Sequence, residues 1–82
     1  KGKTLEKQTI SVSITKDINF YVNEQKVIES NLEDQLKLLL ENQMEPGIIL
    51  HTDKSVDIEH VVKVMDIAYR NKYKIVLATK PN

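Results

Sequence analysis

Two neighbouring segments alternate strictly between apolar and polar residues, and this alternation constrains the fold more than any other feature of the chain. The segments are TISVSIT, residues 9–15, and INFYVN, residues 18–23. Their alternating apolar residues are Ile10, Val12, Ile14, Ile18, Phe20 and Val22. A period of two is typical of a strand with one buried face, because successive side chains point to opposite faces of a sheet. The two-residue link Lys16-Asp17 predicts that the two strands form a hairpin.

Residues 30–44 change to the period of a helix. Leucines recur at three- and four-residue steps and form one apolar stripe, which consists of Leu32, Leu36, Leu39 and Leu40. Ser30 and Glu33 have the S-x-x-E spacing of a capping box, in which each side chain accepts a backbone N–H at the start of the helix. Pro46-Gly47 ends this helix, and the branched residues of IIL, residues 48–50, favour a strand after it.

Residues 57–70 predict a second helix. Asp57 has the position of an N-cap, whose carboxylate can accept backbone N–H groups of the first turn. The apolar face is expected to consist of Ile58, Val61, Val62, Met65, Ala68 and Tyr69, widened by Val64 and Ile67. The opposite face, towards water, holds Lys63, Asp66 and Arg70. Tyr69 and Tyr73 are expected to cover the core, with anchoring of a partner as the alternative.

The last strand is KIVLAT, residues 74–79, which is apolar on both faces apart from its ends. Such a strand is typical of the centre of a sheet or of an edge that pairs with a strand of a partner. The order strand, strand, helix, strand, helix, strand predicts the α+β class, with two helices on one face of a small mixed sheet of four strands. Residues 23–28 leave room for a short extra strand. Eighty-two residues make one domain, and the other face of the sheet is left to solvent or to a second copy.

Composition and charge exclude several function classes. Lysine plus arginine and aspartate plus glutamate number 12 each, so the chain lacks the surplus of cations that nucleic-acid binding requires. Because there is no cysteine, disulfides and thiolate chemistry are excluded. No apolar run approaches the roughly 18 residues of a membrane span. Residues 1–7, KGKTLEK, hold one apolar residue and are expected to be a flexible linker.

Reactive side chains concentrate in residues 51–66, HTDKSVDIEHVVKVMD. A metal site would require four of them to converge: His51, Asp53, Asp57 and His60. Against that site, Asp57 has a simpler role as N-cap, and Asp53 follows a strand where its carboxylate can bind backbone N–H groups. The chain has only two glycines, Gly2 and Gly47, too few for an oxyanion or phosphate loop. We therefore expect a structural cluster, no catalysis and no cofactor, with a small metal-dependent enzyme as the weakest alternative.

An ordered series of short motifs in residues 51–81 resembles the C-terminal half of the ExbD/TolR biopolymer-transport family. That family's pattern is a strand ending in Asp-Lys, a valine, a helix carrying Val-Met-Asp, and a strand ending near a threonine. The residues that fit it are Asp53, Lys54, Val56, Val64, Met65, Asp66 and Ile75 to Thr79. Residues 10–27 resemble the family's opening hairpin, so the resemblance covers residues 8–80. It implies a mainly structural role for Asp53, Lys54, Val56, Asp57, Met65 and Asp66.

The resemblance implies a periplasmic domain at residues 8–82. We expect it on the periplasmic side of the bacterial inner membrane, where residues 1–7 would follow a transmembrane helix that is missing from the sequence. Such a domain resembles part of a stator subunit in a motor driven by the proton motive force. The expected partners are a second copy, an ExbB/TolQ-like channel subunit, a TonB-like or TolA-like protein, and peptidoglycan. An unrelated peptidoglycan-binding or small-ligand-binding module of the same element order is the alternative function.

The final strand is the expected partner or dimer edge. An exposed edge can bind an extended segment through backbone hydrogen bonds, while alternate side chains select the segment. The residues of this candidate edge are Ile75, Val76, Leu77, Ala78 and Thr79. An ordinary internal strand is the alternative interpretation.

Overall fold

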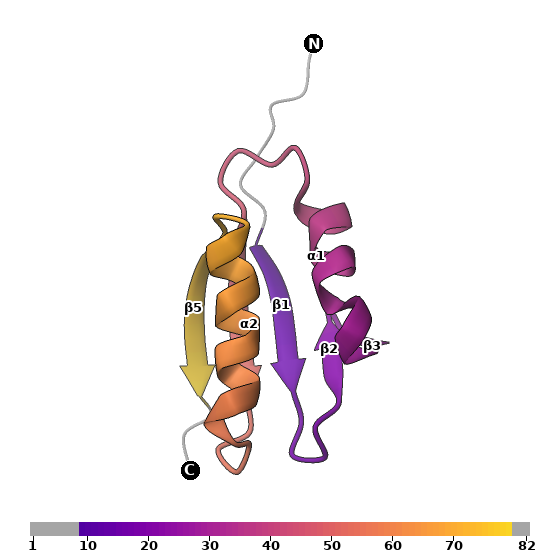
Figure 1. Cartoon of the computed structure of the whole chain (residues 1–82), viewed down its shortest axis with the longest axis vertical. Coiled ribbons are helices and arrows are strands. Elements are labelled where there is room, and N and C mark those ends of the chain that lie inside the picture. Colours follow the sequence, from indigo (N-terminus) through magenta and orange to yellow (C-terminus); the bar gives the residue numbers. More distant parts are fainter. Residues whose placement is uncertain (1–8, 80–82) are drawn as a thin grey trace.

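The computed structural model describes residues 9–79, which form one sheet with two helices packed on one of its faces (Figure 1). In chain order the elements are β1 (Thr9–Ile14), β2 (Phe20–Val22), β3 (Gln25–Val27), the 3-10 turn η1 (Glu29–Asn31), α1 (Leu32–Leu40), β4 (Gly47–Thr52), α2 (Ile58–Arg70) and β5 (Lys74–Thr79). The predicted α+β class and its element order are confirmed, with β3 as a fifth, short strand. Neither helix in the described range has the length and apolar content needed to span a bilayer. The linker expected at residues 1–7 lies outside that range.

The sheet mixes antiparallel and parallel pairs in the order β3-β2-β1-β4-β5. β1, β2 and β3 form an antiparallel meander, whereas β4 lies parallel to β1 and β5 lies parallel to β4. Parallel neighbours need a crossover connection, and α1 and α2 lie on these crossovers, on the same face of the sheet (Figure 1). As a result, β3 and β5 are the two edges of the sheet.

The core lies between the sheet and the two helices. Every second residue of the strands faces the helices, as the alternation in residues 9–23 predicts. The buried apolar side chains of the described residues are Ile10, Val12, Ile14, Phe20, Val22, Leu32, Leu36, Leu40, Ile48, Leu50, Val61, Val64, Ile67 and Ala68. Leu39, the remaining leucine of the predicted stripe in α1, is 37% exposed. No polar or charged side chain in residues 9–78 is buried, so the ionisable groups of that range lie at the surface.

The link between β1 and β2 is longer than the predicted two residues. The amide of Ile18 donates to the carbonyl of Thr15 over 2.9 Å, and the amide of Thr15 donates to the carbonyl of Asn19 over 3.0 Å. Ile18 has a φ of 61°, in the left-handed region that branched side chains rarely adopt. This conformation interrupts the alternation, so β2 begins at Phe20, although Ile18 still packs against the core.

The buried face of α2 differs from the predicted one. Val61, Val64, Ile67 and Ala68 are buried, whereas Ile58 is 72%, Val62 is 53% and Tyr69 is 85% exposed. The apolar stripe of this helix is wider than the face that packs on the sheet, and the sequence alone does not show which flank of the stripe is covered. The prediction that Tyr69 covers the core is therefore wrong, while Tyr73 packs against it as expected.

The two predicted caps also differ from the structure. The N-cap of α1 is Asn31, which follows the 3-10 turn, and no side chain donates or accepts a capping hydrogen bond there. The capping box of Ser30 and Glu33 is not formed, because the Glu33 carboxylate binds Arg70 of α2 and Asn71, the residue after it, instead. Asp57 does occupy the N-cap position of α2, with extended backbone angles, but its carboxylate makes no capping hydrogen bond.

Candidate partner interface

β5 is an edge strand that pairs along its whole length on one side only. Its residues Lys74–Thr79 pair in parallel with Gly47–Thr52 of β4, and no strand of the described chain lies on its other side. The backbone N–H and C=O groups that point outwards from β5 therefore have no sheet partner within the described residues. Only Lys74, at its start, is charged, and the strand contains no proline. Such an edge is a template for an added strand.

The predicted candidate residues Ile75 to Thr79 lie on this edge, and the side chains of Ile75 to Ala78 lie on both faces of the sheet. Val76 is 62% exposed and Leu77 is 43% exposed. Ile75 is half-buried and packs against the core, and Ala78 is half-buried. These exposed apolar side chains are what a partner strand would cover, and the role of the residues as a partner or dimer edge stays a prediction.

An exposed apolar surface of α2 runs alongside this edge. Ile58, Val62, Met65 and Tyr69 recur at four-, three- and four-residue steps, so they form one stripe, which we call the α2 flank. Met65 is half-buried, and the other three are exposed. A shallow hollow of about 380 Å³ lies here, lined by Val62, Met65, Asp66, Tyr69, Tyr73 and Ile75. Side chains from the helix and from β5 thus share one mainly apolar surface.

Tyr73 is one of the residues that line this hollow. Its side chain is half-buried, and burial raises the pKa of its hydroxyl, helped by the nearby carboxylates of Glu33 and Glu41. The neutral phenol is therefore the stable form at ordinary pH, and its ring contributes apolar surface to the site.

Asp53, from the family motif, holds the loop between β4 and α2. Its carboxylate Oδ1 accepts the Ser55 amide at 2.9 Å and the Ser55 hydroxyl at 2.7 Å. These two hydrogen bonds lower the pKa of the Asp53 carboxyl, and the bond from the Ser55 hydroxyl has the larger effect. The Asp53 carbonyl also accepts the amide of Val56, whose half-buried side chain packs against the core. Lys54 is exposed in the same loop.

The side chains proposed as metal ligands do not form a metal site. His51 is exposed on the face of the sheet opposite the helices, because its neighbour Leu50 faces the core. His60 is half-buried on α2, and Asp53 is engaged with Ser55. Within residues 9–79 no three histidine, aspartate or glutamate side chains lie close enough together to hold an ion. The metal-dependent alternative therefore lacks its ligand set.

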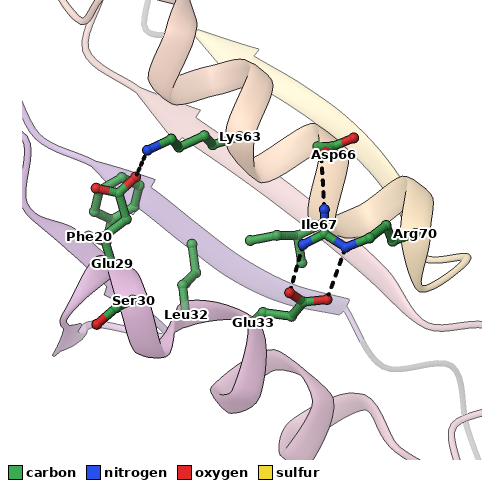
Figure 2. A pocket seen from close by; sticks show the side chains of 9 residues that line it. All are labelled: Phe20, Glu29, Ser30, Leu32, Glu33, Lys63, Asp66, Ile67 and Arg70. Atoms are coloured by element: carbon green, nitrogen blue, oxygen red, sulfur yellow. Dashed lines mark hydrogen bonds and ion pairs between the residues drawn. The ribbon is translucent and has the colours of Figure 1, made fainter.

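An ion-pair network that sequence reasoning missed joins the two helices (Figure 2). The Arg70 guanidinium donates to the Glu33 carboxylate of α1 over 2.7 Å and to Asp66 of its own helix over 2.8 Å. The Asn71 side-chain amide donates to the second oxygen of Glu33 over 2.8 Å. These hydrogen bonds lower the pKa of Glu33 from 4.5 to about 2, and the bond from Arg70 has the largest effect.

A second pair spans the same gap, where Lys63 Nζ lies 3.0 Å from Glu29 Oε2. Between the pairs is a hollow of about 470 Å³, with Phe20, Leu32 and Ile67 on its floor (Figure 2). These ion pairs link α1 and the 3-10 turn η1 to α2. The only sequence signal for the ion-pair network is the four-residue spacing of Asp66 and Arg70. The sequence pattern assigns both residues to the water-facing side of the second helix.

The family model described as "Biopolymer transport protein ExbD/TolR" matches residues 1–82, the full length of the chain. No individually curated protein matches it. The match agrees with the motif series around Asp53 and Val64 to Asp66, and with the single helical layer over a mixed sheet. The chain therefore belongs to the ExbD/TolR family of biopolymer transport proteins.

Proposed function

We propose that this chain is the periplasmic docking domain of a stator subunit in an inner-membrane motor driven by the proton motive force. In this role it forms a dimer and engages a TonB-like or TolA-like protein that carries energy to outer-membrane transport. Membership of a biopolymer-transport family supports the general role. Partners of the ExbB/TolQ type and of the TonB/TolA type are those that the family implies. A transmembrane helix before residue 1 would anchor the domain.

The observation that carries the proposal is the exposed edge of β5. Residues Lys74–Thr79 present one row of outward backbone groups, with Val76 and Leu77 exposed beside it. An extended segment that adds to this edge gains main-chain hydrogen bonds and covers apolar side chains in the same step. A stator domain has to hold and release a moving partner, and strand addition to an edge is a reversible contact that needs no preformed pocket.

An amide NMR titration tests this docking. Peptides from the periplasmic linkers of TonB-like and TolA-like proteins of the same organism are added to the chain, with scrambled peptides of the same composition as controls. We expect shifts concentrated in residues 74–79, saturating with one of the two native peptides. No shift with either peptide up to roughly 1 mM, an affinity of about −4 kcal/mol, contradicts docking on this edge.

A hollow at the end of β1 and β4, where several polar side chains gather, favours peptidoglycan as a second ligand. It measures about 510 Å³ and is lined by Ser13, Ile14, Thr15, Lys16, His51, Thr52, Asp53 and Ala78. Hydroxyl groups, an imidazole and an ammonium suit the hydroxyls and carboxylates of a glycan with peptide stems. Soluble peptidoglycan fragments should then shift the amides of Ser13, His51 and Ala78 and leave Lys74 and Ile75, at the other end of β5, unchanged. Equal shifts with an unrelated oligosaccharide contradict this ligand.

A further inference from the structure

The hollow on the helix side of β5 lies where an added strand would place its side chains. It measures about 380 Å³ and is lined by Val62, Met65, Asp66, Tyr69, Tyr73 and Ile75. Ile75 pairs in register with Ile48, which is 1% exposed, so both side chains lie on the helix side of the sheet. Directly opposed residues of paired strands share a face of the sheet. The residue of an added strand that lies opposite Ile75 therefore directs its side chain into this hollow.

The lining of the hollow favours an aromatic side chain. Tyr69 and Tyr73 supply two aromatic rings, Met65 supplies a thioether, and Val62 and Ile75 are apolar. A ring gains from contact with other rings and with a thioether sulfur, beyond the apolar area that it buries. Because Tyr69 is 85% exposed, such a ring would also cover surface that the described residues leave open. An aromatic residue thus fits this position better than an aliphatic residue.

The charges beside the hollow select the residue next to the ring. Lys74 is exposed and precedes Ile75 on β5, so its side chain lies on the open face of the sheet. Lys72, in the turn before β5, is exposed as well. An acidic residue opposite Lys74 would form a cross-strand pair of opposite charge. In the hollow, an acidic side chain would instead meet the carboxylate of Asp66, whose Oδ2 accepts a hydrogen bond from Arg70.

Resting on the strand docking of the proposed function, we propose that this hollow is the pocket that selects the partner. It takes an aromatic side chain of the docked strand, and the neighbouring residue of that strand is acidic and pairs with Lys74. The partner segment is therefore an extended strand with an acid and a ring side by side at its Lys74 end. β5 itself, KIVLAT, contains neither an acid nor an aromatic ring, so the β5 of a second copy does not supply this pair of residues.

Designed six-residue peptides test this preference by amide NMR titration of the dilute chain. The probe acetyl-Glu-Phe-Thr-Val-Thr-Thr-amide places Glu opposite Lys74 and Phe opposite Ile75 in a parallel strand, and the reversed sequence does so in an antiparallel strand. We expect the tighter of the two to shift residues 74–79 with a dissociation constant below roughly 1 mM. Its ring should show nuclear Overhauser effects to the Met65 methyl group. No binding by either sequence overturns the proposal.

Peptide variants separate the ring from the acid. Exchanging Glu and Phe keeps the composition but turns the ring to the open face and the carboxylate towards Asp66, so the affinity should fall at least about tenfold. Replacing Phe by Ala should weaken binding at least about tenfold, and replacing it by Leu should weaken binding about threefold. An exchanged peptide that binds as tightly as the probe overturns the proposed order of ring and acid. A Leu peptide that binds as tightly overturns the choice of an aromatic ring.

Exposed positions of the chain provide the matched variants. Tyr69→Ala should weaken the Phe peptide about threefold and leave the Ala peptide unchanged, because Tyr69 is exposed in the free chain and acts through the ring. Leu38→Ala on α1, at 69% exposure, is the control and should change neither affinity. Lys74→Glu should make a peptide with Lys in place of Glu the tighter one, whereas Lys26→Glu on β3 should not. Equal effects of Tyr69→Ala on the Phe and Ala peptides overturn a ring contact in this hollow.

The failure of this pocket and the failure of docking are distinguishable. If native linker peptides shift residues 74–79 but the designed peptides do not bind, docking on β5 stands and the pocket is wrong. A native peptide that binds through a segment without an acid next to an aromatic ring also overturns the pocket. If the designed peptides bind in the hollow and neither native peptide binds at β5, the pocket is supported, while the TonB-like and TolA-like partners of the proposed function are contradicted.

Discussion

The two edge strands of the sheet, β3 and β5, differ in length and in the polarity of their exposed side chains. β3 has three residues, Gln25–Val27, of which Gln25 and Lys26 are exposed and polar. It follows a tight turn in which Asn23 and Glu24 both have left-handed backbone angles. β5 has six residues, starts with a single charge, and exposes Val76 and Leu77.

This difference is informative because soluble domains usually protect both edges against strand addition. Short length and a lysine side chain are common protections, and β3 has both. β5 has neither a central charge nor a proline, and the α2 flank adds more exposed apolar surface beside it. Apolar surface that remains exposed over a sheet edge and an adjacent helix is the kind of surface that the proposed docking would cover.

The largest expected effect comes from truncating a buried side chain of β4, the strand that pairs with β5. Leu50 of β4 is fully buried and pairs in register with Leu77. We expect Leu50→Ala to lower the free energy of unfolding by about 2–5 kcal/mol, because it leaves a cavity under the strand. Urea unfolding measures the loss, and hydrogen exchange of the β5 amides should rise before that of β2 and β3. A variant within about 0.5 kcal/mol of the parent chain would show that β5 is not held by this contact.

A charge in the middle of the β5 edge is expected to abolish association. Val76→Lys places an ammonium group in the middle of the edge, beside any strand that is added there, whether from a partner or from a second copy. The affinity for a second copy should fall at least about 100-fold, or about 2.7 kcal/mol. Gln25→Lys, at an exposed position of β3, is the control, and its dimer should dissociate as the parent does in sedimentation. Equal losses for both variants would mean that the two edges do not differ.

Loss of the ion pair between the helices is expected to change acid stability. The folded pKa of Glu33 is lowered from 4.5 to about 2 by hydrogen bonds from Arg70 and Asn71. The unfolded carboxyl binds a proton first, so this contribution to stability is present above pH 4.5 and is lost as pH falls from 4.5 to about 2. Glu33→Gln should therefore lose less stability over that range than the parent chain in urea unfolding. Leu38→Gln, at an exposed position of α1 that carries no ionisable group, should leave the pH profile as it is in the parent.

The smallest expected effect concerns the turn that leads into β3. Glu24 is exposed and has a φ of 74°, a conformation that glycine adopts without a steric cost. Glu24→Gly should raise the free energy of unfolding by about 0.5–1 kcal/mol and leave association at β5 unchanged. Thermal unfolding measures the gain. A lower midpoint would show that the Glu24 side chain stabilises the turn by more than its backbone strain costs.

The sequence predicted the fold well where one local period decides the structure. The alternation of Ile10, Val12 and Ile14 identified β1, and the leucine spacing identified α1. The sequence did not predict features that depend on contacts between segments far apart in the chain. Glu33 fits a capping box locally, but Arg70 lies 37 residues away and binds the carboxylate more strongly than the backbone does.

For the candidate interface, the sequence predicted the β5 edge but not the α2 flank. The apolar run of residues 74–79 suggested an edge, since few polar residues interrupt it. The α2 flank was not found, because Val62 and Tyr69 look like core residues in any helical projection of this sequence. Only the placement of α2 on the sheet shows which side of its wide apolar stripe is left exposed.

Hydrogen exchange at the two edges tests the central claim most directly. The outward amides of β5 and those of β3 are compared in the dilute monomer and in the assembled state, with a second copy or a partner peptide bound. The account predicts that β5 amides exchange rapidly in the monomer and become protected on assembly, while β3 amides stay unchanged. Protection that appears at β3, or an assembly that leaves β5 amides as fast as before, would contradict the assignment of β5 as the docking edge.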